Sequence, residues 1–298
     1  MSETTLHTTA QHPPHTARVR GRAFANRSGI LKKFLSLSVR GHWARVLSRF
    51  LSPLFLLLAW QVACSTGLLS VRLVASPLQI VSTARVLIED GTLLGNLEAS
   101  LGRAASGFCL ALVVGILLAL VSGLSRLGEN IVDAPLQILR TLPVLALVPL
   151  FILWFGIGES PKILLVMLGS LFPIYLNLHK GIRSIDPKLL EMARTLRLSR
   201  WQTIRDIILP GSLPDLLVGV RFAVGLSWLM LVVAEQVNAQ NGIGHMMMDA
   251  QDFLRTDIIF VGLAVYGLLG LISDQFVRFL EYHALVWRST TQGGGVAR

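Results

Sequence analysis

Charge is scarce in this chain of 298 residues, and this scarcity argues against an ordinary soluble protein. Only 15% of the residues are charged, whereas soluble domains average about 25%. A membrane-spanning helix needs about 20 mostly apolar residues. Six stretches approach this length with one charge or none, namely Phe50–Leu69, Ala104–Gly123, Thr141–Gly158, Ile163–Leu178, Leu216–Ala234 and Ile258–Ser273. The sequence therefore predicts an all-α, polytopic membrane protein with about six transmembrane helices.

Motifs for nucleotide, metal and redox chemistry are also missing. No glycine-rich loop ends in Lys-Ser or Lys-Thr, the pattern that binds nucleotide phosphates. His245 and Asp249 stand at helical spacing, but two ligands without a third are weak evidence for a metal site. The cysteines Cys64 and Cys109 lie within predicted spans, where they act as small apolar residues. We expect no catalytic residues, no metal and no cofactor in this chain.

The charge that is present is mostly basic and unequally placed. If both termini are cytoplasmic, the inner segments hold 21 Lys and Arg residues and the outer loops hold five. Cytoplasmic loops are enriched in these residues, so we expect both termini inside. A net charge of +10 can indicate nucleic-acid binding, but here the excess lies beside the spans and is explained by anionic membrane lipid. We expect residues 1–49 to form a basic cytoplasmic tail with an amphipathic approach, and residues 286–298 to form a cytoplasmic C-terminal tail.

Small residues recur every four positions along the second predicted span. They are Gly107, Ala111, Gly115, Ala119 and Gly123. Such a stripe lets another helix approach closely, and we expect that helix to belong to the same chain. In the preceding outer loop, Ser76-Pro77 predicts the start of a short interfacial helix with Val81, Ala84 and Ile88 on one face.

The inner loop at about residues 181–214 predicts two short amphipathic helices. Asp186-Pro187 is typical of a helix start. Ser199 and Gln202 form a second capping pattern, and Pro210 and Pro214 are expected to stop the second helix. A lone amphipathic loop could lie on lipid, but two capped helices joined by a turn favour docking into a groove of another protein.

Several motifs carry a family resemblance. The order Glu191-Met192-Ala193, a turn, and then Ile208-Leu209-Pro210 resembles the "EAA" coupling loop of ABC-importer permeases. Leu142-Pro143 through Pro149-Leu150, Trp154 through Glu159, and Ala234-Glu235 with Asn241 through Gly244 are similar to the permeases for sulfonates, taurine and nitrate. The tract Asp252 through Asp257 resembles the aliphatic-sulfonate branch in particular. The resemblance covers about residues 50–285.

The resemblance implies a permease subunit of an ATP-driven importer in the bacterial inner membrane. It implies partners as well: a second copy of the chain, two cytoplasmic subunits that bind ATP, and a periplasmic solute-binding protein. The solute would be a small anion, with aliphatic sulfonates first and taurine or nitrate as alternatives. The residues that match the coupling loop are Glu191, Met192, Ala193, Arg197, Leu209 and Pro210.

The chain departs from the family pattern at two of these positions. Met192 stands where the family usually has alanine, and Arg197 stands where it usually has glycine. Glycine suits a left-handed turn between the two helices, and another residue loses about 1–2 kcal/mol in that conformation. Either the turn has a different conformation, or Arg197 bears the strain and adds a contact to the ATPase.

Two charges associated with the fifth span are candidates for the solute pathway. Arg221 is the only charge inside that span. An intramembrane charge is a functional hypothesis, although its side chain could instead extend to the headgroups or pair within the protein. Glu235 lies at the outer end of the span and could face the solute-delivering protein or mark the interface. The competing hypothesis, an ion-coupled secondary transporter, would need intramembrane acids, and the predicted spans have none except Glu235 at one edge.

Overall fold

The computed structural model describes residues 51–70 and 73–286, and every regular element in those ranges is a helix. The predicted tail at 1–49 lies outside these residues, as does all of the predicted tail at 286–298 except Val286. The chain divides into two compact units, one up to Ala59 and one from Trp60 onward. The helix Leu51–Ser65 includes residues of both units, and α2 to α11 belong to the second.

Among residues 51–70 and 73–286, four helices are long and apolar enough to cross a membrane. They contain α3 (Thr92–Leu124), α6 (Glu159–Arg183), α9 (Leu209–Asn238) and α11 (Thr256–Ala284). A fifth span exists if α4 (Arg126–Thr141) counts together with η1 (Val144–Leu147) and α5 (Val148–Phe155). Within the described residues, Leu51–Ser65 is apolar but shorter than these spans. The predicted number of six is therefore not confirmed, although the all-helical membrane fold is.

The third predicted span, Thr141–Gly158, is not one straight helix. It includes the break after α4, where the two helical parts meet at 95°. Leu142 has an extended backbone with ψ of 132° directly before Pro143. Because a proline ring clashes with a helical conformation of the preceding residue, α4 ends there and the chain turns.

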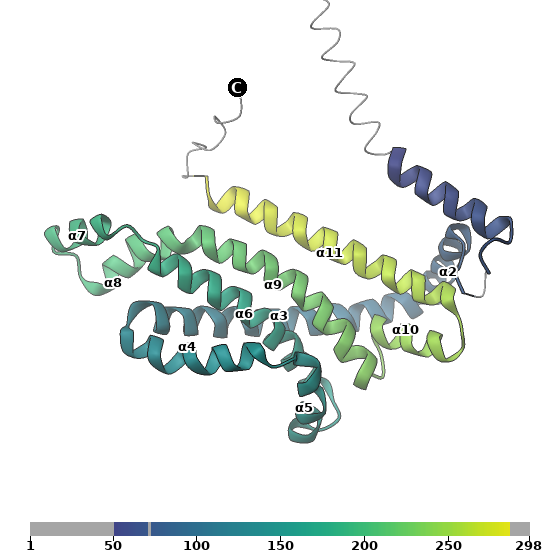
Figure 1. Ribbon diagram of the computed structural model, residues 1–298, viewed down its shortest axis with the longest axis horizontal. Coiled ribbons are helices and arrows are strands. Elements are labelled where there is room, and N and C mark those ends of the chain that lie inside the picture. Colours follow the sequence, from purple (N-terminus) through teal and green to yellow (C-terminus); the bar gives the residue numbers. More distant parts are fainter. Residues whose placement is uncertain (1–50, 71–72, 287–298) are drawn as a thin grey trace, which may run out of the picture. The chain divides into compact units, whose positions relative to one another are not determined.

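Helix α6 lies at the centre, packed against both α3 and α9 (Figure 1). The small-residue stripe of α3 faces it. A Cβ atom added at Gly107 would lie 2.6 Å from Cβ of Val166, and one at Gly115 would lie 2.9 Å from Cγ2 of Ile174. Neither position has room for a side chain, so the predicted neighbour on the bare face is confirmed as a helix of the same chain.

Helix α2 (Pro77–Glu89) begins where the sequence predicts, with Ser76 Oγ accepting the N–H of Gln79. It packs on α11 and α3. Its inward residues are Ile80, Ala84 and Leu87, whereas Val81, predicted to share the apolar face, is exposed. The helix therefore contributes to the bundle core and does not only lie on a surface.

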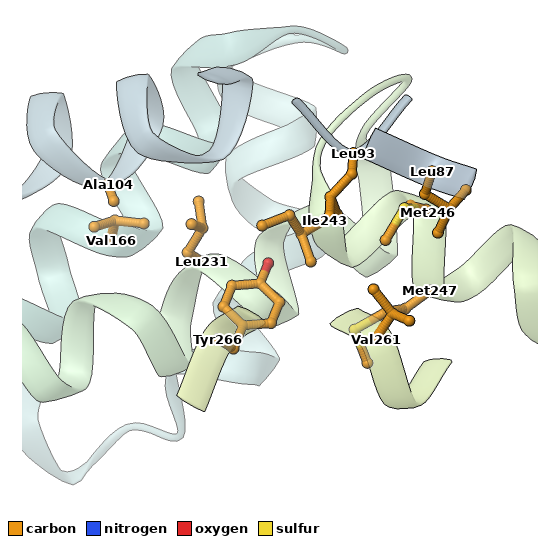
Figure 2. Packing of buried hydrophobic residues seen from close by; sticks show 10 residues of the cluster. All are labelled: Leu87, Leu93, Ala104, Val166, Leu231, Ile243, Met246, Met247, Val261 and Tyr266. Atoms are coloured by element: carbon orange, nitrogen blue, oxygen red, sulfur yellow. The ribbon is translucent and has the colours of Figure 1, made fainter. Parts of the chain in front are cut away.

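The core at this end draws side chains from α2, α3, α6, α9, α11 and α10 (Ile243–Asp252). Figure 2 shows the ring of Tyr266 next to Leu231 and Ile243 in this cluster. The buried members are Leu87, Leu93, Ala104, Val166, Leu231, Ile243, Met246, Met247, Val261 and Tyr266. This packing surrounds the polar group described below.

At the other end of the bundle lie α7 (Pro187–Thr195) and α8 (Arg200–Thr203) (Figure 1). Both predicted starts are confirmed: the Asp186 side chain accepts the N–H of Lys188, and Ser199 and Gln202 form a complete capping box. The predicted stop at Pro210 and Pro214 is wrong, because α8 continues into α9.

The chain passes Pro210 by way of a π-helical turn, η2 (Ile204–Ile208). A proline inside an α-helix clashes with the carbonyl four residues earlier, which here is that of Asp206. The wider π turn contains this carbonyl, and Pro210 falls in the first turn of α9, where a missing N–H is tolerated.

Candidate functional site

The α7–α8 segment (residues 186–208) exposes apolar side chains at the end of the bundle. Leu189 and Met192 on α7 and Leu196 at its C-cap recur at helical spacing, and all three are exposed, as is Trp201 on α8. Ala193 is buried. Exposed apolar side chains of this size, gathered on one short segment, are typical of a protein contact.

The six predicted coupling residues fall into two groups around this segment. Glu191, Met192 and Ala193 are on α7, and Arg197 is in the turn that follows it. Leu209 and Pro210 are in the first turn of α9, after the π turn. Glu191 and Met192 are exposed, whereas Pro210 is half-buried.

Arg197 bears backbone strain in the turn between α7 and α8. Its φ is +52°, in the left-handed region. The turn is closed by the Leu198 N–H, which donates to the carbonyl of Ala193 at 3.0 Å. The structure therefore keeps the left-handed turn for which the family glycine is suited, and a residue with a Cβ loses about 1–2 kcal/mol there.

A buried polar network occupies the opposite end of the bundle, and Arg103 of α3 is at its centre. Its side chain is 4% exposed. A guanidinium has five N–H donors, and all five are used. Nε and Nη2 donate to the two carboxylate oxygens of Glu159 at 2.5 and 2.9 Å. Nη1 donates to Glu235 and to the backbone carbonyl of Asn241, both at 2.7 Å, and Nη2 also donates to Asn241 Oδ1.

Glu235 of α9 is the buried anion of the network, with no exposed surface. Besides Arg103, its carboxylate accepts from Ser100 Oγ, from the Gly244 N–H at 2.9 Å and from the Tyr266 hydroxyl at 2.9 Å. These donors come from α3, α10 and α11. In this conformation Glu235 fixes α3, α10 and α11 to α9, and its predicted place in the solute pathway stays a prediction.

Glu159, in the first turn of α6, is the surface member of the network. Its side chain is 55% exposed, in contrast to Arg103 and Glu235. One of its oxygens also accepts from Lys162 Nζ at 3.0 Å, and the Lys162 side chain is 5% exposed. Two nearly buried cations therefore share one carboxylate that reaches the surface.

Arg221, the other predicted pathway residue, belongs to a different group. Its Nε donates to Asp274 on α11 at 2.7 Å, and Asp274 also accepts from Arg278 at 2.8 Å. Arg221 and Glu235 are 14 residues apart on α9, which is about 21 Å along the axis. They do not form a common site, and Arg221 pairs within the protein.

Sequence reasoning missed Arg103 and Lys162, which it counted as charges of outer loops. A usable signal was present in α3. Asn96, Ser100 and Arg103 share a face with Gly107, at spacings of four, three and four residues. A polar stripe in line with a stripe of small residues indicates a buried face, and the structure buries Ser100 and Arg103 there.

No group of three or more metal-ligating side chains occurs among residues 51–70 and 73–286. His245 and Asp249 form a pair on α10 with their nearest atoms 3.3 Å apart.

Comparison with known proteins identifies relatives over most of the chain. A permease protein of Escherichia coli named for aliphatic sulfonates transport is 46% identical over 82% of this chain and 93% of its own length. A Bacillus subtilis protein of the same name is 43% identical over 82% of this chain and 88% of its own length. The taurine transport system permease protein of Escherichia coli is 33% identical over 80% and 88%.

The fold has solved counterparts as well. An amino acid ABC transporter crystal structure has a chain with a TM-score of 0.57 and 15% identity, covering 67% of this chain and 97% of that one. Residues 111–284 match the family model described as binding-protein-dependent transport system inner membrane component. This chain belongs to that family, whose members are components of transport systems and not enzymes.

Proposed function

We propose that this chain is the permease subunit that forms the transmembrane pathway for aliphatic sulfonates in an ATP-driven importer. The observation that carries the proposal is the difference in identity among relatives. Two permeases named for aliphatic sulfonates are 43% and 46% identical to it, and one named for taurine is 33% identical. All three are covered over 88% or more of their length, so the difference does not arise from partial matches.

The α7–α8 segment is the proposed contact with the ATP-binding subunits. Its exposed Leu189, Met192, Leu196 and Trp201 would enter a groove of the partner, as amphipathic helices do. Glu191, Met192, Ala193 and Arg197 would form or support that contact, and Leu209 and Pro210 would join it to α9. Movement of the segment after ATP binding would bias the bundle between inward- and outward-facing states.

The remaining assembly follows from this arrangement. Both termini would be cytoplasmic, the permease core would run from about 50 to 285, and the Arg103 end would then face the periplasm and the binding protein. A second copy of the chain would complete the pathway. The exposed apolar side chains of α5, which include Leu153 and Trp154, provide a surface that such a copy would cover.

The test is uptake of labelled solute by cells that lack their own sulfonate permease and carry this chain with its neighbouring transporter genes. We expect uptake of short alkanesulfonates that is reduced by unlabelled alkanesulfonate and little affected by taurine or nitrate. Uptake that taurine or nitrate suppresses more strongly than alkanesulfonate would assign the chain to one of those solutes instead.

A further inference from the structure

Glu159 differs from the rest of the Arg103 network in its access to solvent. Its side chain is 55% exposed, whereas those of Arg103, Lys162 and Glu235 are at most 5% exposed. The space that its carboxylate fills is therefore open to the outside, and the two cations behind it are covered. If the carboxylate moved, the edge of Arg103 that carries Nε and Nη2 would become accessible from that side.

The donors that converge on Glu159 match a different anion better than a carboxylate. Arg103 Nε, Arg103 Nη2 and Lys162 Nζ lie 2.5, 2.9 and 3.0 Å from its two oxygens. One oxygen therefore accepts from two of the three donors. A sulfonate has three oxygens and could give each donor its own, in the forked geometry that favours Arg with oxyanions.

Charge is balanced in such an exchange. Without Glu159, the group consists of Arg103, Lys162 and Glu235, with a net charge of one positive. A sulfonate carries one negative charge, as the Glu159 carboxylate does, so replacement leaves no uncompensated charge in a site of low polarity.

The rest of the network would keep the site formed during the exchange. Arg103 retains three hydrogen bonds when Glu159 leaves, one to Glu235 and two to Asn241. The Glu159 side chain is 55% exposed, so it borders solvent on the side away from Arg103 and Lys162. Glu159 can therefore leave while the guanidinium stays in place.

We propose that Arg103 and Lys162 form a receiving site for the oxyanion head group of the solute, and that Glu159 occupies this site until the solute displaces it. The proposal rests on the proposed function for the identity of the anion, a sulfonate. It assigns a binding role to residues 103, 159 and 162 at the end of the bundle remote from α7 and α8.

The experiment measures anion binding by the complete complex of permease and ATP-binding subunits in lipid nanodiscs, without the binding protein, by titration calorimetry. The probes are hexanesulfonate and hexanoate, which share one alkyl chain and differ in the head group. We expect Glu159→Gln to bind hexanesulfonate at least about tenfold more tightly than the unsubstituted protein, because the internal competitor loses its charge. The gain for hexanoate should be smaller.

Two further variants separate the site from general charge effects. Lys162→Gln added to Glu159→Gln should abolish the gain, and Glu89→Gln, which removes an exposed carboxylate of α2, should bind as the unsubstituted protein does. If Glu159→Gln proves unstable, the same binding should raise its melting temperature when hexanesulfonate is added. No gain in affinity or melting temperature, or a gain that survives Lys162→Gln, would overturn the proposal.

Failure of the site can be told apart from failure of the proposed function. If cells import nitrate and not alkanesulfonate, and Glu159→Gln tightens nitrate binding through Lys162, the receiving site stands and the solute assignment falls. If cells import alkanesulfonate and Glu159→Gln binds it no more tightly, the solute assignment stands and the receiving site falls.

Discussion

The two ends of the helix bundle differ in the kind of side chain that they bury and the kind that they expose. At the Arg103 end, charged groups are buried and every N–H of the guanidinium has an acceptor. At the α7–α8 end, apolar side chains such as Leu196 and Trp201 are exposed, and Arg197 is held in a strained backbone conformation. The polar groups at the Arg103 end have partners within the bundle, whereas the α7–α8 end has an apolar surface that residues 51–70 and 73–286 leave uncovered.

We infer that stability and coupling depend on different ends of the bundle. Removing one partner from a buried ion pair leaves an uncompensated charge, which is costly, so the Arg103 end should control whether the bundle forms. Changes on an exposed segment have little effect on folding, so the α7–α8 end should control what the folded bundle does. Three substitutions test this comparison, in order of decreasing effect on stability.

The largest loss is expected from Glu235→Ala. The substitution removes the fully buried anion and leaves Arg103, Ser100 and Tyr266 without one of their acceptors. Breaking a buried pair in this way costs about 3–5 kcal/mol, measured as a lower melting temperature of the purified protein in detergent. Glu89→Ala, at an exposed pair with Arg85, is the matched control and should change stability by less than about 1 kcal/mol. Equal losses for both would mean that the network does not hold the bundle together.

Gly115→Leu should have the next largest effect. A side chain at this position would meet Ile174 on α6, since even a Cβ would lie 2.9 Å from its Cγ2. Overpacking of this kind costs about 1–3 kcal/mol, again seen in the melting temperature, with loss of transport. Val113→Leu, on the exposed face of the same helix, should be tolerated. Similar behaviour of the two variants would show that α3 can move away from α6 freely.

Glu191→Arg should leave stability nearly unchanged, within about 0.5 kcal/mol, because its side chain is exposed on α7. It should nonetheless abolish solute-stimulated ATP hydrolysis by the assembled importer, since it reverses the charge on the proposed contact. Glu98→Arg, a reversal at an exposed position of α3 near the opposite end, is the control. Normal hydrolysis and import by Glu191→Arg would remove α7 from the coupling contact.

Much of the fold could be predicted from short patterns in the sequence. The stripe from Gly107 to Gly123 requires a close neighbour whatever that neighbour is, and α6 fills this place. Capping residues act within a few positions of themselves, so the starts at Ser76, Asp186 and Ser199 could be predicted and are confirmed.

Features that depend on distant partners could not be predicted in this way. The acceptors of Arg103 are on α6, on α9 and in the turn at Asn241. No local sequence pattern indicates that these three segments come together around Arg103. Hydropathy treats such an arginine as the end of a span, although burial with partners makes it part of one. Pro210 likewise stops a regular α-helix, but a change of helix type just before it removes the conflict.

The π turn at Ile204–Ile208 also determines the direction in which the side chains of α8 face around the helix axis, relative to those of α9. Each residue of an α-helix advances by about 100°, and a π turn, with bonds from i to i+5, holds about one residue more than an α turn. The side chains of α8 therefore stand about 100° around the helix axis from where an uninterrupted helix would present them. A deletion of one residue between Ile204 and Ile208 would restore a regular α turn and leave Trp201 facing the same side of the bundle, but it would bring back the clash of Pro210 with the carbonyl four residues earlier. The extra residue of the π turn therefore lets the chain pass Pro210 within one continuous helix without changing the direction in which the α7–α8 segment faces.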